Sequence, residues 1–500
     1  MRDILAFSLV FIYPDTMPFT FFNTLGRKMQ VFEPLQASPG ASPDGGKVGF
    51  YGCGPTVYNY AHIGNLRAYV LHDVLVRSLR RYGYEVNHVM NITDVGHLSD
   101  DADDGDDKMV KSANERGKSV LEIAEMYAKA FFNDTSRMNI TLPTVVCKAT
   151  DHIGDMIALI QRIEQNGYTY FAGGNLYFDI AKATGYGELA LLRLDDLKAG
   201  ARIAVDEFKR NPHDFVLWFT KSKFENQALV WDSPWGRGYP GWHIECSAMS
   251  IKYLGEQFDI HAGGIDHIPI HHTNEIAQSE AATGKKPWVK YWLHNEFLVL
   301  DKGKMSKSSG GFLTLQKLVD EGYDPLDYRY FLLSGHYRSQ LQFSWDSLTG
   351  AKNARKSLMD TVRALSRSGA AAQREEINKK EFEIDLEKNY LYAFNKALED
   401  DLNTPRALAE LWGLLRDVSV EPQAALAAAF DMDRVLGLGL STAPPPEDAV
   451  LAQEIEVIIG RRAEAKRAKD FAMADSLRQG LKERGIILED SAGGTTWRRV

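Results

Sequence analysis

The alternation of apolar and polar positions predicts a strand, a helix and a second strand near the start of the chain. Residues 48–51 (Val-Gly-Phe-Tyr) have the length of a buried strand and end at the turn 52–55 (Gly-Cys-Gly-Pro). Residues 65–81 keep helical spacing, and residues 85–93 alternate as a strand. A strand–helix–strand unit is typical of a parallel sheet. We therefore expect an α/β fold with a Rossmann-like, doubly wound parallel sheet.

Helical spacing dominates the rest of the chain. Apolar residues follow a helical period around residues 121–131 and 153–160, within a segment of about 96–230 that we expect to be inserted between two halves of the sheet. From about residue 345 the chain is rich in Ala, Leu, Lys and Glu. This predicts an α-helical bundle over residues 346–440, with a loop at 366–372 (Ser-Arg-Ser-Gly-Ala-Ala-Ala).

The last part of the chain has a different character. Residues 441–446 contain consecutive prolines, which block a helix and predict a linker. Beyond it, residues 459–500 hold ten Lys or Arg and six Asp or Glu. A small C-terminal domain over 447–500 that binds RNA is one interpretation, and a solvated basic helix is the other. Trp497 and Arg498 are the candidate RNA contacts, although Trp497 is also suited to packing within its own domain.

Composition limits the classes of protein to which the chain can belong. With 500 residues, 44% of them hydrophobic, it has the length of several globular domains. A net charge of −9 argues against a uniformly basic nucleic-acid binder, and three cysteines are too few for a disulfide framework. Cys147 is interpreted as a small core residue.

The N-terminal segment and an acidic run need separate interpretation. Residues 4–13 are mostly apolar but too short to span a bilayer, and Asp3 and the lack of a small-residue cleavage site argue against a signal peptide. We interpret residues 1–21 as an N-terminal extension, in which Met17 is the true start and the segment before it is an over-extended reading frame. We expect a cytoplasmic protein without a membrane partner. Residues 100–107 are almost all aspartate, which we interpret as a solvated loop rather than a calcium site.

Three separate segments carry side chains suited to a metal. Cys53 follows the first predicted strand, Cys246 lies in 241–247 (Gly-Trp-His-Ile-Glu-Cys-Ser), and His271 and Glu275 are spaced i, i+4. On a helix that spacing places both side chains on one face, whereas the alternative ligand His272 lacks it. Two thiolates, an imidazole and a carboxylate form a plausible tetrahedral zinc set.

Two further motifs have the chemistry of phosphate binding. Residues 62–65 (His-Ile-Gly-Asn) lie where the first strand passes into its helix, a position that favours anions. There a histidine can donate a hydrogen bond to developing phosphate charge. Residues 304–308 (Lys-Met-Ser-Lys-Ser) place Lys304 and Lys307 on a Gly-rich loop that can close over a triphosphate.

These motifs, in this order, resemble the two signatures of class I aminoacyl-tRNA synthetases. Within that class, residues 53–58 (Cys-Gly-Pro-Thr-Val-Tyr) and 242–249 (Trp-His-Ile-Glu-Cys-Ser-Ala-Met) are similar to the cysteinyl-tRNA synthetases. So are residues 91–94, 261–266, 403–405 and 488–498. The resemblance runs from about residue 22 to the C-terminus.

The resemblance implies roles for individual residues. Cys53, Cys246, His271 and Glu275 would bind one Zn²⁺ per chain. His62, Asn65, Lys304 and Lys307 would contact ATP and act in catalysis, and Asp266 would lie near the ribose. Gly54, Thr93 and Trp242 would line the amino-acid pocket. The first signature often ends in histidine, and Asn65 in its place can donate a hydrogen bond but cannot become cationic.

The resemblance also implies a domain order and a reaction. A catalytic domain over 22–345 would precede the helical bundle and a C-terminal anticodon-binding domain. Cysteine would be activated with ATP and Mg²⁺, and the cysteinyl group passed to the 3′ end of tRNA(Cys), with a monomer expected. The alternatives are a ligase that joins cysteine to an amino-sugar and an inactive RNA-binding relative.

Overall fold

The computed structural model places most of the chain. It describes residues 18–35, 46–95, 112–113, 115–192, 207–221, 229–300, 303–304, 313–372, 390–442, 447–468, 470–491 and 494–499. Met17 and the residues before it, the acidic run 100–107, Lys307 and the prolines 444–446 lie outside these ranges. The chain divides into two compact units, Met1–Leu440 and Ser441–Val500, and each is described by itself.

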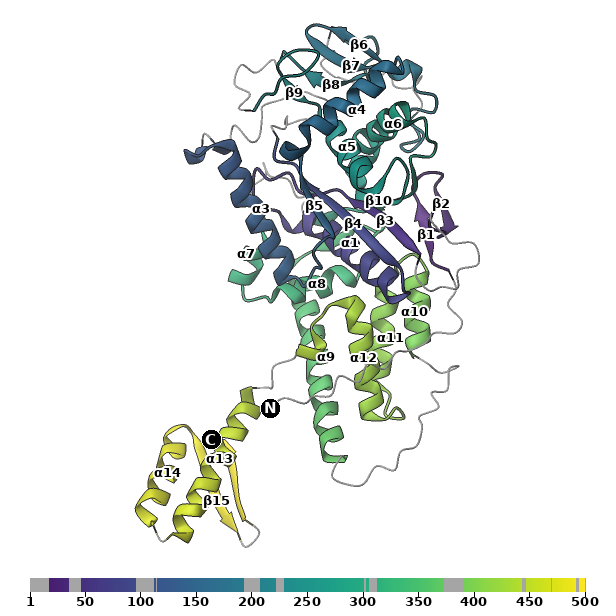
Figure 1. The fold of residues 1–500 in the computed structure, drawn as a ribbon. Helices are drawn as coiled ribbons and strands as arrows, with labels where there is room; N and C mark the ends of the chain where they lie inside the picture. Colours follow the sequence, from purple (N-terminus) through teal and green to yellow (C-terminus); the bar gives the residue numbers. More distant parts are fainter. Residues whose placement is uncertain are drawn as a thin grey trace. The chain divides into compact units, whose positions relative to one another are not determined.

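A five-stranded parallel sheet forms the centre of the first unit (Figure 1). Its strands are β3 (Lys47–Gly52), β4 (Glu85–Ile92), β5 (Val145–Lys148), β10 (Phe258–Gly264) and β11 (Val289–Asn295), in the order β11-β10-β3-β4-β5. The chain moves outward from β3 in one direction and from β10 in the other, so the sheet has its topological switch point between β3 and β10. The expected doubly wound parallel sheet is confirmed.

Helices cover both faces of this sheet. Helix α1 (Ile63–Arg81) connects β3 to β4, and the ring of His72 on α1 lies 5.4 Å from that of Phe50 on β3. The next residue, Tyr51, points to the opposite face, as alternation along a strand requires. There it joins an apolar cluster with α4 (Ile153–Gln165), α5 (Trp242–Leu254) and α6 (Thr273–Thr283).

The segment between β4 and α5 contains helices and also a second sheet. Helix α3 (Val120–Arg137) packs beside the end of β4 through Ile123 and Tyr127, whereas Leu121 is 51% exposed. Four short strands form an antiparallel sheet that the sequence analysis did not anticipate. They are β6 (Thr169–Ala172), β7 (Asn175–Phe178), β8 (Phe215–Phe219) and β9 (Tyr239–Pro240). Strands this short give too few alternating positions for a periodic signal.

Short elements complete this part of the unit. A hairpin of β1 (Thr20–Asn23) and β2 (Lys28–Val31) lies at its start. After β11, strand β12 (Leu298–Leu300) pairs with β13 (Gly303–Lys304) and with β14 (Leu341–Phe343). Helices α7 (Leu315–Asp320) and α8 (Pro325–Leu333) lie between β13 and β14.

The expected helical bundle follows, with one correction. It contains α9 (Trp345–Ala372), α10 (Tyr390–Glu399), α11 (Thr404–Arg416) and α12 (Pro422–Leu436). The loop expected at 366–372 is wrong, because α9 continues to Ala372. The alanines there are strong helix formers and offset the cost of about 1 kcal/mol that Gly369 imposes.

A buried ion pair joins several of these elements. Arg329 on α8 and Asp73 on α1 are 2.6 Å apart, and both side chains are fully buried. Arg329 also donates to the carbonyls of Met138, Asn139 and Leu436, at the ends of α3 and α12. One guanidinium therefore satisfies helix-end carbonyls that would otherwise lack partners.

The second unit has a small core of its own. Helices α13 (Glu447–Arg467) and α14 (Phe471–Glu483) precede a hairpin of β15 (Ile486–Ser491) and β16 (Gly494–Arg499). Ile455, Leu481, Ile486 and Leu488 form the buried cluster, and Trp497 packs against it. Within the described residues of both units, no helix is long and apolar enough to cross a membrane.

Candidate functional site

The turn after β3 is held against the end of β4 by a chain of polar contacts. Gly54 N donates to Asn91 Oδ1 at 2.8 Å, and Asn91 Nδ2 donates to Thr93 Oγ1 at 3.1 Å. The Thr93 hydroxyl in turn donates to Glu245 on α5 at 3.0 Å. A Cβ at Gly54 would lie 1.6 Å from the Asn91 carbonyl oxygen, so only glycine allows this approach. These contacts fix where Cys53 lies.

The four predicted metal ligands come together at this point. Their donor atoms, from Cys53, Cys246, His271 and Glu275, all lie within 4.8 Å of one another, and all four residues are buried. Cys53 follows β3, and Cys246 lies on α5. His271 lies on the short helical turn Ile268–His272 that leads into α6, and Glu275 lies on α6 itself. Three elements far apart in sequence thus supply one donor set.

The arrangement inside this set fits a shared ion. His271 Nε2 and Glu275 Oε1 are 2.8 Å apart, yet that oxygen accepts no hydrogen bond from the described residues. His271 Nδ1 lies 3.1 Å from His243 Nδ1, which turns the other ring nitrogen toward the cluster. Metal-bound histidines are commonly oriented in this way by a partner of the second nitrogen.

The electrostatics of the cluster also favour a cation. Burial would raise the pKa of the Cys53 thiol, but the Cys246 thiol and the His272 imidazole hold it well below its usual value. Burial would also raise the pKa of Glu275, but His271 and His261 lower it to about 2. Burial opposes a charge on His271, yet Glu275 raises its pKa to about 10. Anionic donors are therefore balanced here by an imidazolium, whose place a divalent cation can take.

A second donor set shares two of these residues. Cys53, His261, His272 and Glu275 also bring their donor atoms within 4.8 Å of one another. His272 Nε2 lies 3.2 Å from Cys53 Sγ, while its Nδ1 contacts His294 Nε2 at 2.7 Å. The set with Cys246 matches the donors that zinc prefers more closely, because it offers two thiolates.

Several residues around the donors were not singled out from the sequence. Burial raises the pKa of Glu245 to about 8, although the Thr93 hydroxyl donates to it. His243, His261 and His294 surround the donor set through ring contacts and hydrogen bonds. The available signal was the concentration of histidines between residues 243 and 294.

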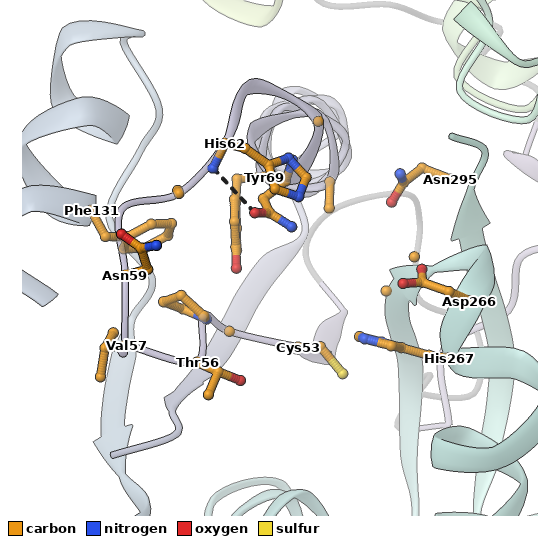
Figure 2. A pocket seen from close by; sticks show the side chains of 18 of the residues that line it. Cys53, Thr56, Val57, Asn59, His62, Tyr69, Phe131, Asp266, His267 and Asn295 are labelled. Atoms are coloured by element: carbon orange, nitrogen blue, oxygen red, sulfur yellow. Dashed lines mark hydrogen bonds between the residues drawn. The ribbon is translucent and has the colours of Figure 1, made fainter. Parts of the chain in front are cut away.

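The phosphate motif forms the start of α1. His62 is the N-cap, with His62 Nδ1 accepting from Asn65 N at 3.1 Å and Asn65 Oδ1 accepting from His62 N at 3.3 Å (Figure 2). Because Nδ1 is an acceptor, a neutral His62 carries its proton on Nε2. Asn65 therefore fixes the orientation of the histidine ring, with Nε2 as its donor nitrogen.

Both ends of the lysine loop are attached near this motif. On the C-terminal side of the loop that carries Lys304 and Lys307, Leu313 O accepts from Ile63 N at 2.8 Å. The backbones of Thr314 and His62 also pair there as an isolated antiparallel β-bridge. Before the loop, the buried Arg67 on α1 donates to the carbonyls of Glu296 and Phe297, which lead into β12. Lys304 lies in β13, while Lys307 lies outside the described residues.

A cavity of about 320 Å³ reaches from Cys53, the member of the donor set that lines it, to the phosphate motif. Among the predicted residues, its lining includes Cys53, Gly54, His62, Asn65, Trp242 and Asp266. Trp242 stacks on His271 with ring centroids 4.0 Å apart. Thr93 lies behind the cavity wall, where it bonds to Glu245.

Figure 2 shows that the cavity has two sides. Asp266, His267 and Asn295 lie on one side, toward β10 and β11, and Val57, Asn59 and Phe131 lie on the other. His62 and Cys53 lie between them. The switch point of the sheet is thus at the centre of the cavity, where nucleotides bind in doubly wound folds.

The two predicted RNA contacts lie in the second unit. Trp497 on β16 is partly buried against the cluster of Ile455, Leu481 and Leu488. Arg498 is the next residue of the same strand and pairs with Ile487 of β15. Trp497 therefore has a packing role, which was the alternative left open by the sequence.

Comparison with known proteins assigns most of the chain. Residues 41–353 match the family described as tRNA synthetases class I (C) catalytic domain. Residues 393–440 match the DALR domain, and residues 448–498 match the cysteinyl-tRNA ligase anticodon binding domain.

Individual relatives match over nearly the whole chain. A protein of Treponema denticola named cysteine--tRNA ligase is 59% identical over 496 residues, covering 96% of this chain and 99% of the relative. A protein of Burkholderia lata named cysteine--tRNA ligase 1 is 46% identical, covering 96% of each. Among solved structures, a Mycobacterium tuberculosis methionyl-tRNA synthetase bound by methionyl-adenylate aligns with a TM-score of 0.54 at 16% identity. That alignment covers 81% of this chain and 93% of the other.

Proposed function

The chain belongs to the cysteine--tRNA ligase family of class I tRNA synthetases, and from this premise we propose that it charges tRNA(Cys) with cysteine at the expense of ATP. The observation that carries the proposal is the convergence of Cys53, Cys246, His271 and Glu275 beside a cavity that also holds His62 and Asp266. A thiol-binding group and a nucleotide-binding group then face the same space.

We propose that the four donors hold one zinc ion. Bound zinc would supply a Lewis acid that takes the substrate thiol as a thiolate. An apolar pocket rejects an isosteric hydroxyl only about a hundredfold, so the chemistry of a thiol is needed to exclude serine. Trp242, stacked on His271, closes the cavity beside these donors.

The residues around the start of α1 support the activation step. A carboxylate oxygen of cysteine forms a bond to the α-phosphorus of ATP, and the bond to the bridging oxygen of the β-phosphate breaks. Pyrophosphate leaves with that electron pair, and Mg²⁺ enters with ATP as part of the substrate. His62 donates from Nε2 to the developing charge, and Lys304 and Lys307 neutralise the leaving group. Asp266 accepts hydrogen bonds from ribose hydroxyls.

The transfer step completes the reaction. A hydroxyl oxygen of the terminal ribose of tRNA forms a bond to the carbonyl carbon of cysteinyl-adenylate, and the bond from that carbon to the phosphate oxygen breaks. AMP leaves, and its phosphate takes the hydroxyl proton. The second unit, matched to an anticodon binding domain, would recognise the far end of the tRNA.

We propose that the protein is a cytoplasmic monomer.

An amino-sugar ligase with a similar catalytic domain is not favoured. Such an enzyme does not need an anticodon binding domain, and this chain carries one over residues 448–498. An inactive RNA-binding relative would have no need of a buried donor set beside His62.

Two assays on the purified chain test the proposal. Cysteine-dependent exchange of pyrophosphate into ATP should be observed, with serine far less effective. Charging of a tRNA(Cys) transcript should follow at about one zinc per chain, as expected for a site with four protein donors. Exchange without charging would indicate the amino-sugar ligase, and the absence of both would indicate an inactive relative.

A further inference from the structure

The cavity has a side that cysteine and ATP do not account for. We define the β10 arm as Gly263, Gly264, Asp266, Asn295 and Leu298, and the α3 arm as Val57, Asn59, Tyr60, Tyr127 and Phe131. In Figure 2 the labelled members of the two arms, Asp266 and Asn295 on one side and Val57, Asn59 and Phe131 on the other, lie on opposite sides of Cys53 and His62. We propose, on the basis of the function above, that the α3 arm receives the terminal adenosine of the tRNA.

The β10 arm has the chemistry of the ATP site. Asp266 offers a carboxylate for a ribose diol, and it lies where the two strands nearest the switch point end. A Cβ at Gly264 would lie 2.3 Å from Asp266 Oδ1, so a larger residue there would displace this carboxylate. With adenosine in this arm, phosphate at His62 and the thiol at the metal donors, the activated substrate is accommodated without the α3 arm.

The α3 arm lies on the far side of β3 from that site. The backbones of Thr56 and Thr93 pair as an isolated parallel β-bridge at the end of β4, and Val57 N donates to Thr93 O at 3.2 Å. The segment that begins at Thr56 therefore starts beside the end of β4. Helix α3 supplies Tyr127 and Phe131. The one reactant that remains to be placed beside the adenylate carbonyl is the terminal nucleoside of the tRNA.

Aromatic rings in this arm suit a nucleobase. Tyr60 is 47% exposed at its rim, and its ring contacts that of Tyr127 edge-on with centroids 5.0 Å apart. An exposed aromatic face beside a cavity is the usual surface on which an unpaired base stacks, and each such contact contributes about 1–3 kcal/mol.

Polar groups in the arm suit the edge of the base. The Tyr127 side chain is 1% exposed, and no hydrogen bond of ordinary geometry reaches its hydroxyl from the described residues. Asn59 Oδ1 accepts from Tyr60 N at 2.8 Å, which leaves the Asn59 amide as a donor for a base nitrogen.

A cation lies beside the same rings. The guanidinium of Arg116 lies 5.6 Å from the centre of the Tyr127 ring. Its Nη1 donates to the Ser112 hydroxyl at 3.1 Å and to the Ser112 carbonyl at 3.4 Å, and its ion pair with Glu115, at 3.4 Å, is partly exposed and therefore weak. In the proposed complex Arg116 would exchange these contacts for the phosphate that precedes the terminal nucleoside.

Substitutions at Tyr60 test the assignment. Tyr60→Leu removes the ring from an exposed position and should leave cysteine-dependent pyrophosphate exchange within about twofold of the wild type. In single-turnover transfer from enzyme-bound cysteinyl-adenylate, the tRNA concentration for half-maximal rate should rise about tenfold, the equivalent of 1.4 kcal/mol of stacking. Tyr60→Phe keeps the ring and should behave as the wild type. Tyr392→Leu, at a 48% exposed tyrosine on α10, is the matched control.

A shortened tRNA identifies the nucleoside concerned. The wild-type enzyme should bind tRNA(Cys) about tenfold more tightly than the same transcript without its terminal adenosine, and Tyr60→Leu should abolish this difference. Equal losses of exchange and transfer would overturn the assignment, because the arm would then serve the adenylate. Unchanged transfer with unchanged tRNA binding would overturn it as well. If the wild-type enzyme shows no exchange at all, the proposed function itself fails.

Discussion

At the scale of single residues, Cys246 separates the metal role from the nucleotide role. Cys246→Ser replaces a thiolate with a poor zinc ligand, so zinc content should fall and cysteine should bind at least tenfold more weakly. The affinity for ATP should change little, since the donor set does not touch the phosphates. Metal analysis and equilibrium binding of the two substrates measure these effects.

Cys147 provides the control for that substitution. It is buried like Cys246, but its thiol donates to the Met90 carbonyl and lies outside both donor sets. Cys147→Ser should therefore keep its zinc and its affinity for cysteine. A Cys246→Ser variant that retained a full complement of zinc would contradict the ligand set.

Arg67 is the second residue whose substitution should change one measurement and not the other, here the rate of pyrophosphate exchange and not the affinity for cysteine. Its guanidinium donates to the carbonyls of residues 296, 297, 336, 337 and 339, over distances of 2.6–3.4 Å. Arg67→Lys keeps the charge but loses the planar fork, so β12 and the start of the lysine loop should shift relative to His62. We expect kcat for pyrophosphate exchange to fall roughly 10- to 100-fold, with the affinity for cysteine unchanged.

Arg80→Lys, at an exposed position on the same helix, is the control for Arg67. A general loosening of α1 would lower the affinity for cysteine together with the exchange rate. Equal losses in both measurements would therefore show that Arg67 only stabilises the fold.

At the scale of elements, the buried pair Arg329–Asp73 joins α8, α1 and the ends of α3 and α12. Burial would raise the pKa of Asp73, but Arg329 and Arg77 hold it below its ordinary value of 3.8. Arg329→Met leaves this carboxylate with the partly exposed Arg77 and the Thr141 amide, and breaking a buried pair costs about 3–5 kcal/mol. Calorimetry should show a melting temperature several degrees lower.

The pH dependence of that loss has a definite sign. A carboxylate with a depressed pKa contributes stability above its unfolded pKa and loses it as the pH falls through the folded value. The gap in melting temperature between the wild type and Arg329→Met should be constant down to about pH 5 and should narrow below about pH 4. A gap that widened in acid would contradict the ionised state of Asp73.

The elements predicted from the sequence are those with a long or unusual signal. Residues 65–81 keep their period over several turns, and donors such as Cys53 and Cys246 are rare enough to be noticed. Arg67 gave no such signal, because a single basic residue in a helix resembles a surface position. The carbonyls it binds belong to segments more than two hundred residues away.

The remaining differences arise from tertiary contacts. The strands β6 to β9 are stabilised by pairing with one another, which a short window of sequence does not contain. Trp497 was open to two interpretations, because the sequence does not show whether a tryptophan ring is exposed to stack on an RNA base or buried to pack within its own domain. Its contact with the core of the second unit supports packing.

At the scale of the whole molecule, we expect the two units to divide the reaction between them. Deleting residues 441–500 removes a unit with its own core and leaves intact every described residue assigned to activation. Pyrophosphate exchange should be retained and charging of tRNA(Cys) should fall by at least a hundredfold. Because phosphate contacts weaken with salt, charging by the intact chain should be the more salt-sensitive activity. A truncated chain that still charged tRNA normally would contradict this division.

The placement of the metal donors has a consequence for how the protein is made. Cys53 emerges early from the ribosome, but Glu275 is synthesised only when more than half of the chain exists. No shorter nascent chain carries the complete donor set, so the zinc site proposed above could form only after α6 has been made and has packed against the sheet. A chain that folded without the metal would then lack the group proposed to tell cysteine from serine.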